Sequence, residues 1–365
     1  MTTNSLRPRR RPAPRRLQPM WTDTVTLQGV AETNWVADLA GQHGFVSEQL
    51  EALLSAGVEI PGLKSIVIVR DGLLVGERYY HGASAAHLLP INSVTKSVSG
   101  MLVGLALESG RLPRLQARVR DLLPDAAALH PDSPLAGVTL QQILQGRSGH
   151  SFDVARSREL LNEADPIRFA LALPATPPTP SGWSYNDAAI SLLSPMLQRA
   201  EGLDLAALAA RSLFAPLGIR RYAWQRDRAN RTLAYAGLAL RTRDLAKLAW
   251  MVLQQGRWHD QQVLPAEWVA EGTRPHGAAE WRAPPMQDVG YGYLWFNGTL
   301  TPEPPSKNPQ PLVWGLGYGG QFALIAPQLR LVIATAAASP PPEQAMAQMQ
   351  AVRSLVARVV QAAGE

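Results

Sequence analysis

Ser93 and Lys96 stand three positions apart in the stretch PINSVTKSVSG (90–100), in a chain that has only four lysines against thirty-one arginines. Apolar residues at helical spacing predict a helix from residue 93 to 109, and residues three apart share one helix face. A serine at a helix start has N–H groups nearby that stabilise an oxyanion, and a lysine shielded from water can accept its proton. Alternatively Ser93 caps the helix and Lys96 is solvated, although the apolar flanks predict burial. The pair alone leaves both interpretations open.

Tyr185 and Asp187 lie in SGWSYNDAAISLL, between a proline-rich loop and a predicted helix. A tyrosine phenol can relay a proton if a nearby cation lowers its pKa. The alternative is a core or rim tyrosine beside Asp187 as a helix N-cap. Taken alone, this stretch favours the alternative.

The stretch WGLGYGGQFALIAP (314–327) contains Gly315, Gly317 and Gly320 in the spacing of a dinucleotide fingerprint. That fingerprint requires a strand before the glycines and a helix after them, whereas these glycines run into a predicted strand. A glycine-rich entry to a strand instead indicates close approach of a ligand to the backbone, or a tight turn between two strands.

The predicted elements form strands at both ends of the chain and helices in the middle. A hairpin is expected over 65–80, with Asp71-Gly72 as its turn, and strands return at 291–296, 311–315, 321–326 and 329–337. Ser47 and Thr139 are expected N-caps. We therefore predict an α+β fold in which residues 45–110 and 286–363 form a lobe with a central antiparallel sheet, residues 111–285 form a helical lobe, and a cleft between them holds the site.

Composition excludes several classes of function. The net charge of +6 comes from six arginines before residue 17; without them 29 basic residues face 29 acidic ones, so nucleic acid is not an expected partner. Residues 1–30 are predicted to be a disordered Arg/Pro-rich tail. No apolar run is long enough for a membrane span, and the N-terminal stretch lacks the apolar region of an export signal. This favours a cytoplasmic location over a periplasmic or secreted one, unless the start of the chain is misassigned. The absence of cysteine excludes thiolate chemistry, and the scattered histidines show no metal-ligand spacing.

Taken together and in this order, the three stretches resemble the serine β-lactamase and penicillin-binding-protein superfamily. They look most like its class C-related branch of esterases, D-stereospecific peptidases and 6-aminohexanoate-oligomer hydrolases. The family order is Ser-x-x-Lys, then Tyr-x-Asn, then Lys/His-x-Gly on a strand. Here SVTK, Tyr185-Asn186-Asp187 and Tyr318-Gly319-Gly320 occupy these places, and the resemblance runs from about residue 45 to about 360.

The resemblance implies a metal-free and cofactor-free hydrolase of small-molecule esters or amides, with a β-lactamase-like fold. Ser93 would be the acylated nucleophile, Lys96 the general base and Tyr185 the proton shuttle. The backbone N–H groups of Ser93 and Gln321 would form the oxyanion hole. A β-lactamase, a D-Ala-D-Ala carboxypeptidase and a non-catalytic ligand-binding member of the same fold are the alternatives.

Two departures from the family pattern bear on the substrate. Asp187 replaces the usual asparagine; it would repel a carboxylate-bearing substrate and could pair with Lys96. Tyr318 replaces a cation that meets the β-lactam carboxylate or polarises the catalytic tyrosine. Both changes favour neutral or amine-bearing esters and amides over β-lactams. The expected substrate-binding set is Asp187, Tyr318, Gly319, Gly320, Trp183 and Trp314, with core packing as the alternative for the tryptophans.

Overall fold

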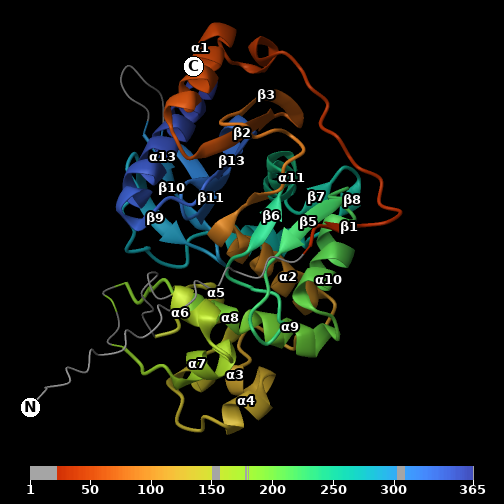
Figure 1. Ribbon diagram of the computed structural model, residues 1–365, viewed down its shortest axis with the longest axis vertical. Helices are drawn as coiled ribbons and strands as arrows, with labels where there is room; N and C mark the ends of the chain where they lie inside the picture. The colour runs from red at the N-terminus through yellow and green to blue at the C-terminus, as the bar shows by residue number, and fades with distance from the viewer. Residues whose placement is uncertain (1–22, 150–156, 177–178, 180, 302–308, 365) are drawn as a thin grey trace, which may run out of the picture.

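A seven-stranded antiparallel sheet forms the upper part of the molecule in Figure 1 and a group of helices the lower part. The structure is a computed structural model and describes residues 23–149, 157–176, 179, 181–301 and 309–364. The strand order is β3-β2-β13-β12-β11-β10-β9. The bounds are β2 (Leu63–Arg70), β3 (Leu73–Tyr79), β9 (Met286–Tyr291), β10 (Phe296–Leu300), β11 (Gln310–Gly317), β12 (Gln321–Ala326) and β13 (Leu331–Ala337). Pairing of β2 with β13 joins the two ends of the chain, which confirms the predicted α+β architecture.

The hairpin of β2 and β3 forms where the sequence places it. Asp71 and Gly72 both adopt positive φ, of 54° and 84°, as a two-residue type I′ turn requires. Strand β13 is buried along its whole length, as expected for a strand covered on both faces.

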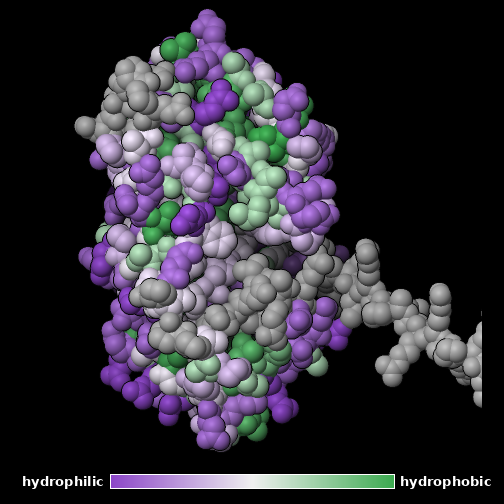
Figure 2. All heavy atoms as spheres, turned by 90° about the vertical axis from the view of Figure 1, so that its left-hand side faces the viewer, coloured by the Kyte–Doolittle hydropathy of each residue, from purple (hydrophilic) through white to green (hydrophobic). Residues whose placement is uncertain are grey.

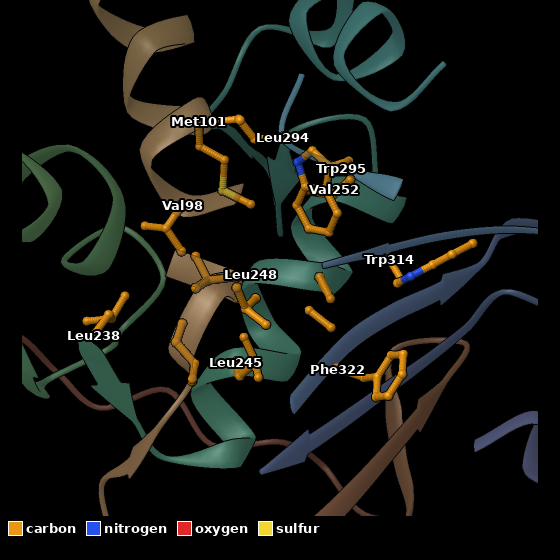
Figure 3. Close-up of a cluster of buried hydrophobic side chains, with 14 of the residues drawn as sticks. Val98, Met101, Leu238, Leu245, Leu248, Val252, Leu294, Trp295, Trp314 and Phe322 are labelled. Atoms are coloured by element: carbon orange, nitrogen blue, oxygen red, sulfur yellow. The ribbon is translucent and has the colours of Figure 1, made fainter. Parts of the chain in front are cut away.

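The helices surround the sheet and fill the lower region. They are α1 (Ser47–Ala56), α2 (Thr95–Glu108), α3 (Val119–Leu122), α4 (Pro124–Ala128), α5 (Leu140–Leu144), α6 (Ser157–Asn162), α7 (Pro166–Ala172), α8 (Asp187–Ser191), α9 (Leu193–Glu201), α10 (Leu205–Ala209), α11 (Thr242–Leu253), α12 (Ala266–Thr273) and α13 (Pro342–Gly364). Helices α1 and α13 lie side by side at the top of Figure 1. Helix α11 packs against β2, β12 and β13, and its leucines join side chains of α2, β11 and β12 in the hydrophobic cluster of Figure 3.

The division into lobes at residues 110 and 285 stays a prediction. The position of helix α11 is relevant to where the boundary between the lobes lies. Residues 242–253 were expected in the helical lobe, and they pack against the large sheet. Thr139 caps α5 in a capping box with Gln142, as predicted. Ser47 is not the N-cap of α1: it already occupies the first helical position, and Val46 precedes it without a side-chain cap.

A second, small sheet was not predicted. Its strands are β1 (Val25–Thr26), β5 (Arg221–Trp224), β6 (Leu238–Leu240) and β4 (Leu89–Pro90), in the order β1-β5-β6-β4, and a two-stranded ribbon joins β7 (Arg257–Trp258) to β8 (Gln261–Gln262). Such short strands carry too few residues to show a period of two. Residues 1–22 of the predicted disordered tail lie outside the described residues. Val25 and Thr26 pair with Tyr222 and Arg221, so the prediction of disorder up to residue 30 is wrong for this segment.

Hydrophilic residues cover most of the face in Figure 2, and the hydrophobic ones on it are dispersed among them. Within the described ranges, the search for a helix of membrane-spanning length and apolarity finds none. The same residues contain no cluster of three or more His, Asp or Glu side chains that could bind a metal ion.

Candidate active site

Ser93 lies in a single 3-10 turn, Asn92–Val94, directly before α2, rather than in the first turn of the α-helix itself. Asn92 has a φ of 45°, in the left-handed region that asparagine tolerates better than most residues. Its side-chain amide donates to the Tyr318 carbonyl at 2.6 Å and to Ser339 Oγ at 3.1 Å. These two hydrogen bonds of Asn92 hold the 3-10 turn in place. Ser93, the middle residue of the turn, is half-buried.

Lys96 lies one turn further along, and its side chain is 3% exposed. Its ammonium nitrogen is 2.7 Å from Ser93 Oγ, 2.8 Å from the Tyr235 carbonyl oxygen and 2.8 Å from Asp187 Oδ1. Burial lowers the pKa of Lys96, and the Asp187 carboxylate opposes that shift because it favours the charged form. The lysine is thus buried, paired and in contact with the serine that the sequence singled out.

The second motif brings Tyr185 and Asp187 to the same point. Asn186, rather than Asp187, is the N-cap of α8, since its side chain accepts from the Ala189 N–H. Asp187 is the first helical residue, 4% exposed, and Ser157 Oγ donates to its Oδ2 at 2.5 Å. The expected pairing of Asp187 with Lys96 is confirmed.

The Tyr185 ring lies against the same ammonium group. Lys96 Nζ is 4.7 Å from the ring centroid, within cation–π range. Burial, followed by the Asp187 carboxylate, raises the pKa of the Tyr185 phenol well above its usual value, and a hydrogen bond with the Ser93 side chain opposes the shift. Ser93, Lys96, Tyr185 and Asp187 therefore form one connected polar cluster.

The third motif is not on a strand, as the resemblance implied, but in the turn between β11 and β12. Tyr318, Gly319 and Gly320 form that turn, and the two glycines have φ of 99° and 105°. A Cβ on Gly319 would lie 2.9 Å from the Ala338 carbonyl oxygen, and one on Gly320 would lie 2.8 Å from Val352 of α13. Backbone conformation and packing against the C-terminal segment thus account for both glycines, and the Tyr318 hydroxyl donates to the Pro340 carbonyl at 3.2 Å.

The two glycines that face the Ser93 turn are Gly315 and Gly317, on β11. A Cβ on Gly315 would lie 2.9 Å from Val94 Cγ1, and one on Gly317 would lie 2.6 Å from the Ile91 carbonyl oxygen. Gln321 opens β12 opposite Gly317, is fully buried and donates its side-chain amide to Ala337. Strands β11 and β12 both pack against the Ser93 turn.

Aromatic side chains surround Tyr185. Trp183 lies 6.4 Å from it and 5.5 Å from Tyr291, and the partly exposed Trp281 lies 6.1 Å from it, all between ring centroids. Trp183 also lines a pocket of about 450 Å³ together with Gln142, Arg147 and Thr176. Trp314 is 1% exposed and stacks on Phe296, so among these residues it belongs to the core.

Sequence reasoning missed four residues of this neighbourhood: Asn92, Ser157, Tyr235 and Trp281. Tyr235 contributes a backbone carbonyl, which any residue type could supply, so no sequence signal exists for it. Ser157 and Trp281 reach the site through the tertiary fold alone. Asn92 carried a usable signal, because asparagine directly before a candidate nucleophile favours a left-handed turn.

Comparison with known proteins identifies the family. The family model described as Beta-lactamase matches residues 50–358, which is most of the chain. The protein belongs to the β-lactamase family. The assignment of Ser93, Lys96 and Tyr185 to catalytic places rests on the motif order given above and stays a prediction.

Individual relatives of this β-lactamase-family chain are remote. It is 25% identical over 294 residues to the 6-aminohexanoate-dimer hydrolase of Paenarthrobacter ureafaciens, which covers 76% of this chain and 73% of that protein. A Bacillus anthracis structure described as a candidate 6-aminohexanoate-dimer hydrolase superposes with a TM-score of 0.72 at 19% identity, covering 94% and 92% of the two chains. A penicillin-binding-protein homologue from Caulobacter crescentus gives 0.64 at 16% identity, covering 94% and 99%.

Proposed function

We propose that this protein is a serine hydrolase that cleaves an ester or amide bond through an acyl-enzyme on Ser93. The observation that carries the proposal is the 2.7 Å contact between Ser93 Oγ and the buried Lys96 Nζ. Ser93 is half-buried, whereas Lys96 is almost completely shielded from bulk water. A lysine in that position can act as a general base towards the hydroxyl.

In the proposed reaction, Ser93 Oγ attacks the substrate carbonyl carbon as its proton passes to neutral Lys96. The oxyanion that forms accepts hydrogen bonds from the backbone N–H of Ser93 and of Gln321. Collapse breaks the bond to the leaving group, which takes a proton by way of the Tyr185 phenol. A water molecule then attacks the acyl-enzyme, the acid is released and Ser93 regains its proton. Because the pKa of Tyr185 is raised, its phenol is protonated before each transfer.

The charges at the site favour a substrate that has no carboxylate beside the scissile bond. Asp187 neutralises Lys96, and Tyr318, at the position where the family pattern has a cation, is turned towards Pro340. The relative from Paenarthrobacter is named for a dimer of 6-aminohexanoate, a linear amide with an amine at one end and a carboxylate at the other, and five methylene groups separate that carboxylate from the amide nitrogen. We therefore propose neutral or amine-bearing esters and linear amides as the substrate class, with Trp183 and Trp281 beside the acyl group.

The proposal is tested with p-nitrophenyl esters, linear amides of amino acids and nitrocefin, assayed with the wild-type protein and the Ser93→Ala variant. We expect the wild type to hydrolyse esters or amides faster than nitrocefin. Ser93→Ala should lose this activity by about 10³-fold or more while keeping its circular dichroism spectrum. Undiminished hydrolysis by Ser93→Ala would overturn the proposal.

A further inference from the structure

A cavity distinct from the site at Ser93 is lined mainly by aromatic and basic side chains. Its volume is about 280 Å³, near the lower end of the roughly 300–1,000 Å³ range of small-molecule sites. None of the described residues that line it belongs to the polar cluster at Ser93, so the proposed hydrolysis leaves the cavity without a role. Its aromatic and basic lining residues are Trp35, Trp250, Trp258, Arg257, His259 and Arg330.

Three tryptophans from separate parts of the chain form the aromatic wall of the cavity. Trp35, on the N-terminal segment, lies 6.5 Å from Trp250 of α11 and 5.6 Å from Trp258 of β7, measured between ring centroids. Both pairs meet edge to face. Trp250 and Trp258 are buried, whereas Trp35 is half-buried. Aromatic rings attract one another in offset and edge-to-face arrangements, so a further flat ring suits this wall.

Hydrogen bonds hold the N-terminal side of the cavity in place. Trp35 Nε1 donates to the Arg243 carbonyl at 3.0 Å. The Val36 carbonyl accepts from the Leu74 N–H at 2.8 Å, which joins the N-terminal segment to β3. A wall that is already fixed lets a ligand bind without the cost of ordering the chain.

The charges around the cavity favour an anion. None of the described residues that line it is an aspartate or a glutamate. Arg330 is already paired, since its Nε donates to Asp71 Oδ1 at 2.7 Å, and its guanidinium lies 5.9 Å from the Trp250 ring centroid. Arg257 is exposed and donates to the Asp260 backbone carbonyl at 3.3 Å, and no carboxylate among the described residues pairs with it. Arg257 is thus the cation that remains available to a ligand.

Two lining residues have a left-handed backbone, which few residue types adopt readily. His259, in the turn between β7 and β8, has a φ of 50°, and Arg330, directly before β13, has a φ of 48°. Glycine would adopt this conformation at lower cost. Both positions instead carry a polar side chain that lines the cavity, and backbone strain of this kind is concentrated at ligand sites.

We propose that this cavity binds a small planar anion, of the chemical class of aromatic carboxylates. The ring would lie against Trp35, Trp250 and Trp258, and the carboxylate would accept hydrogen bonds from the Arg257 guanidinium. A guanidinium can bind a carboxylate through two parallel hydrogen bonds, whereas it repels a cation on the same ring. This binding is independent of the hydrolysis proposed for Ser93.

The test is isothermal titration calorimetry of the full-length protein with 2-naphthoate, which has two fused rings and one carboxylate. We expect saturable binding with a Kd below about 1 mM. The neutral compound 2-naphthalenemethanol has the same rings and should bind at least about tenfold more weakly, because it cannot accept charge-assisted hydrogen bonds from Arg257. Absence of 2-naphthoate binding, or equal binding of the two compounds, would refute the inference.

Substitution of Arg257 locates the binding site. Arg257→Ala should raise the Kd for 2-naphthoate by about tenfold or more. Arg168→Ala, which removes an exposed arginine of α7 outside the cavity, is the matched control and should leave the Kd unchanged. Arg257→Gln keeps a polar side chain and should show a similar loss if Arg257→Ala does not fold. An unchanged Kd in a folded Arg257 variant would mean that the compound binds elsewhere, and the inference would be wrong.

Discussion

Two buried lysines in this protein have almost the same surroundings and, we propose, different roles. Lys96 and Lys247 are both nearly inaccessible, each lies within 3 Å of an aspartate, and each donates to a backbone carbonyl. Burial lowers the pKa of both, and the paired aspartate opposes the shift in both. A buried lysine paired with an aspartate is therefore not by itself evidence of catalysis.

The difference lies in the third partner. Lys96 touches the half-buried hydroxyl of Ser93, whereas Asp244, the partner of Lys247, is held by Arg241 at 2.6 and 2.9 Å. Arg241 also binds Glu32 on the N-terminal segment. The charged groups around Lys247 pair with one another, and through Arg241 and Glu32 they connect α11 to the N-terminal segment. We call Lys247, Asp244, Arg241 and Glu32 the closed cluster. The cluster at Lys96 ends at the hydroxyl of Ser93, a residue that is half-buried.

The largest expected effect separates these two lysines directly. Lys96→Met should lower kcat/KM for ester hydrolysis by about 10³-fold, because the hydroxyl of Ser93 loses its proton acceptor. The measurement is steady-state hydrolysis of a p-nitrophenyl ester, with circular dichroism as the control for folding. Retention of more than a tenth of the wild-type activity would remove the distinction between the two clusters.

A smaller effect should come from the turn that presents Ser93. Asn92→Ala removes two hydrogen bonds and places a residue that disfavours positive φ at 45°, so we expect kcat/KM to fall about tenfold. Asn92→Gly keeps the backbone conformation and should lose less. If the two variants behave identically in the same assay, backbone strain plays no part in positioning the nucleophile.

The smallest effect on catalysis is expected at the closed cluster. Lys247→Met should leave kcat/KM within about twofold of the wild type, because no atom of this cluster reaches Ser93. It should lower the free energy of unfolding by about 1–3 kcal/mol, since the Gly218 carbonyl and Asp244 each lose a donor. Urea denaturation gives the second quantity, and a large loss of activity at full stability would contradict the comparison.

Sequence patterns predicted the long strands, from their apolar residues, and the hairpin turn, from its Asp-Gly pair. The Asp71-Gly72 turn and strands β11, β12 and β13 were placed correctly because period and turn chemistry are local. The strand predicted over 291–296 is wrong: these residues connect the end of β9 to the start of β10. The two-residue and three-residue strands of the small sheet could not be placed, since their pairing depends on segments far apart in the chain.

The candidate site shows the same limit at the level of single residues. Ser93, Lys96 and Asp187 were found from spacing and type, and the structure brings them together. The glycine stretch was found too, but its spacing could not tell which glycines face the segment around Ser93. Gly315 and Gly317 do, whereas Gly319 and Gly320 face the C-terminal segment. Side-chain direction at a hairpin depends on the register and on the turn, which residue types alone do not determine.

The central claim is that Ser93 is acylated during turnover, and acid quenching tests it most directly. Mixing the protein with an excess of p-nitrophenyl ester, quenching within the first turnovers and mapping the peptides by mass spectrometry should show the acyl group on Ser93. The Lys96→Met variant should show far less adduct at the same time. Turnover without any acyl adduct on Ser93, or with the adduct on another residue, would contradict the account.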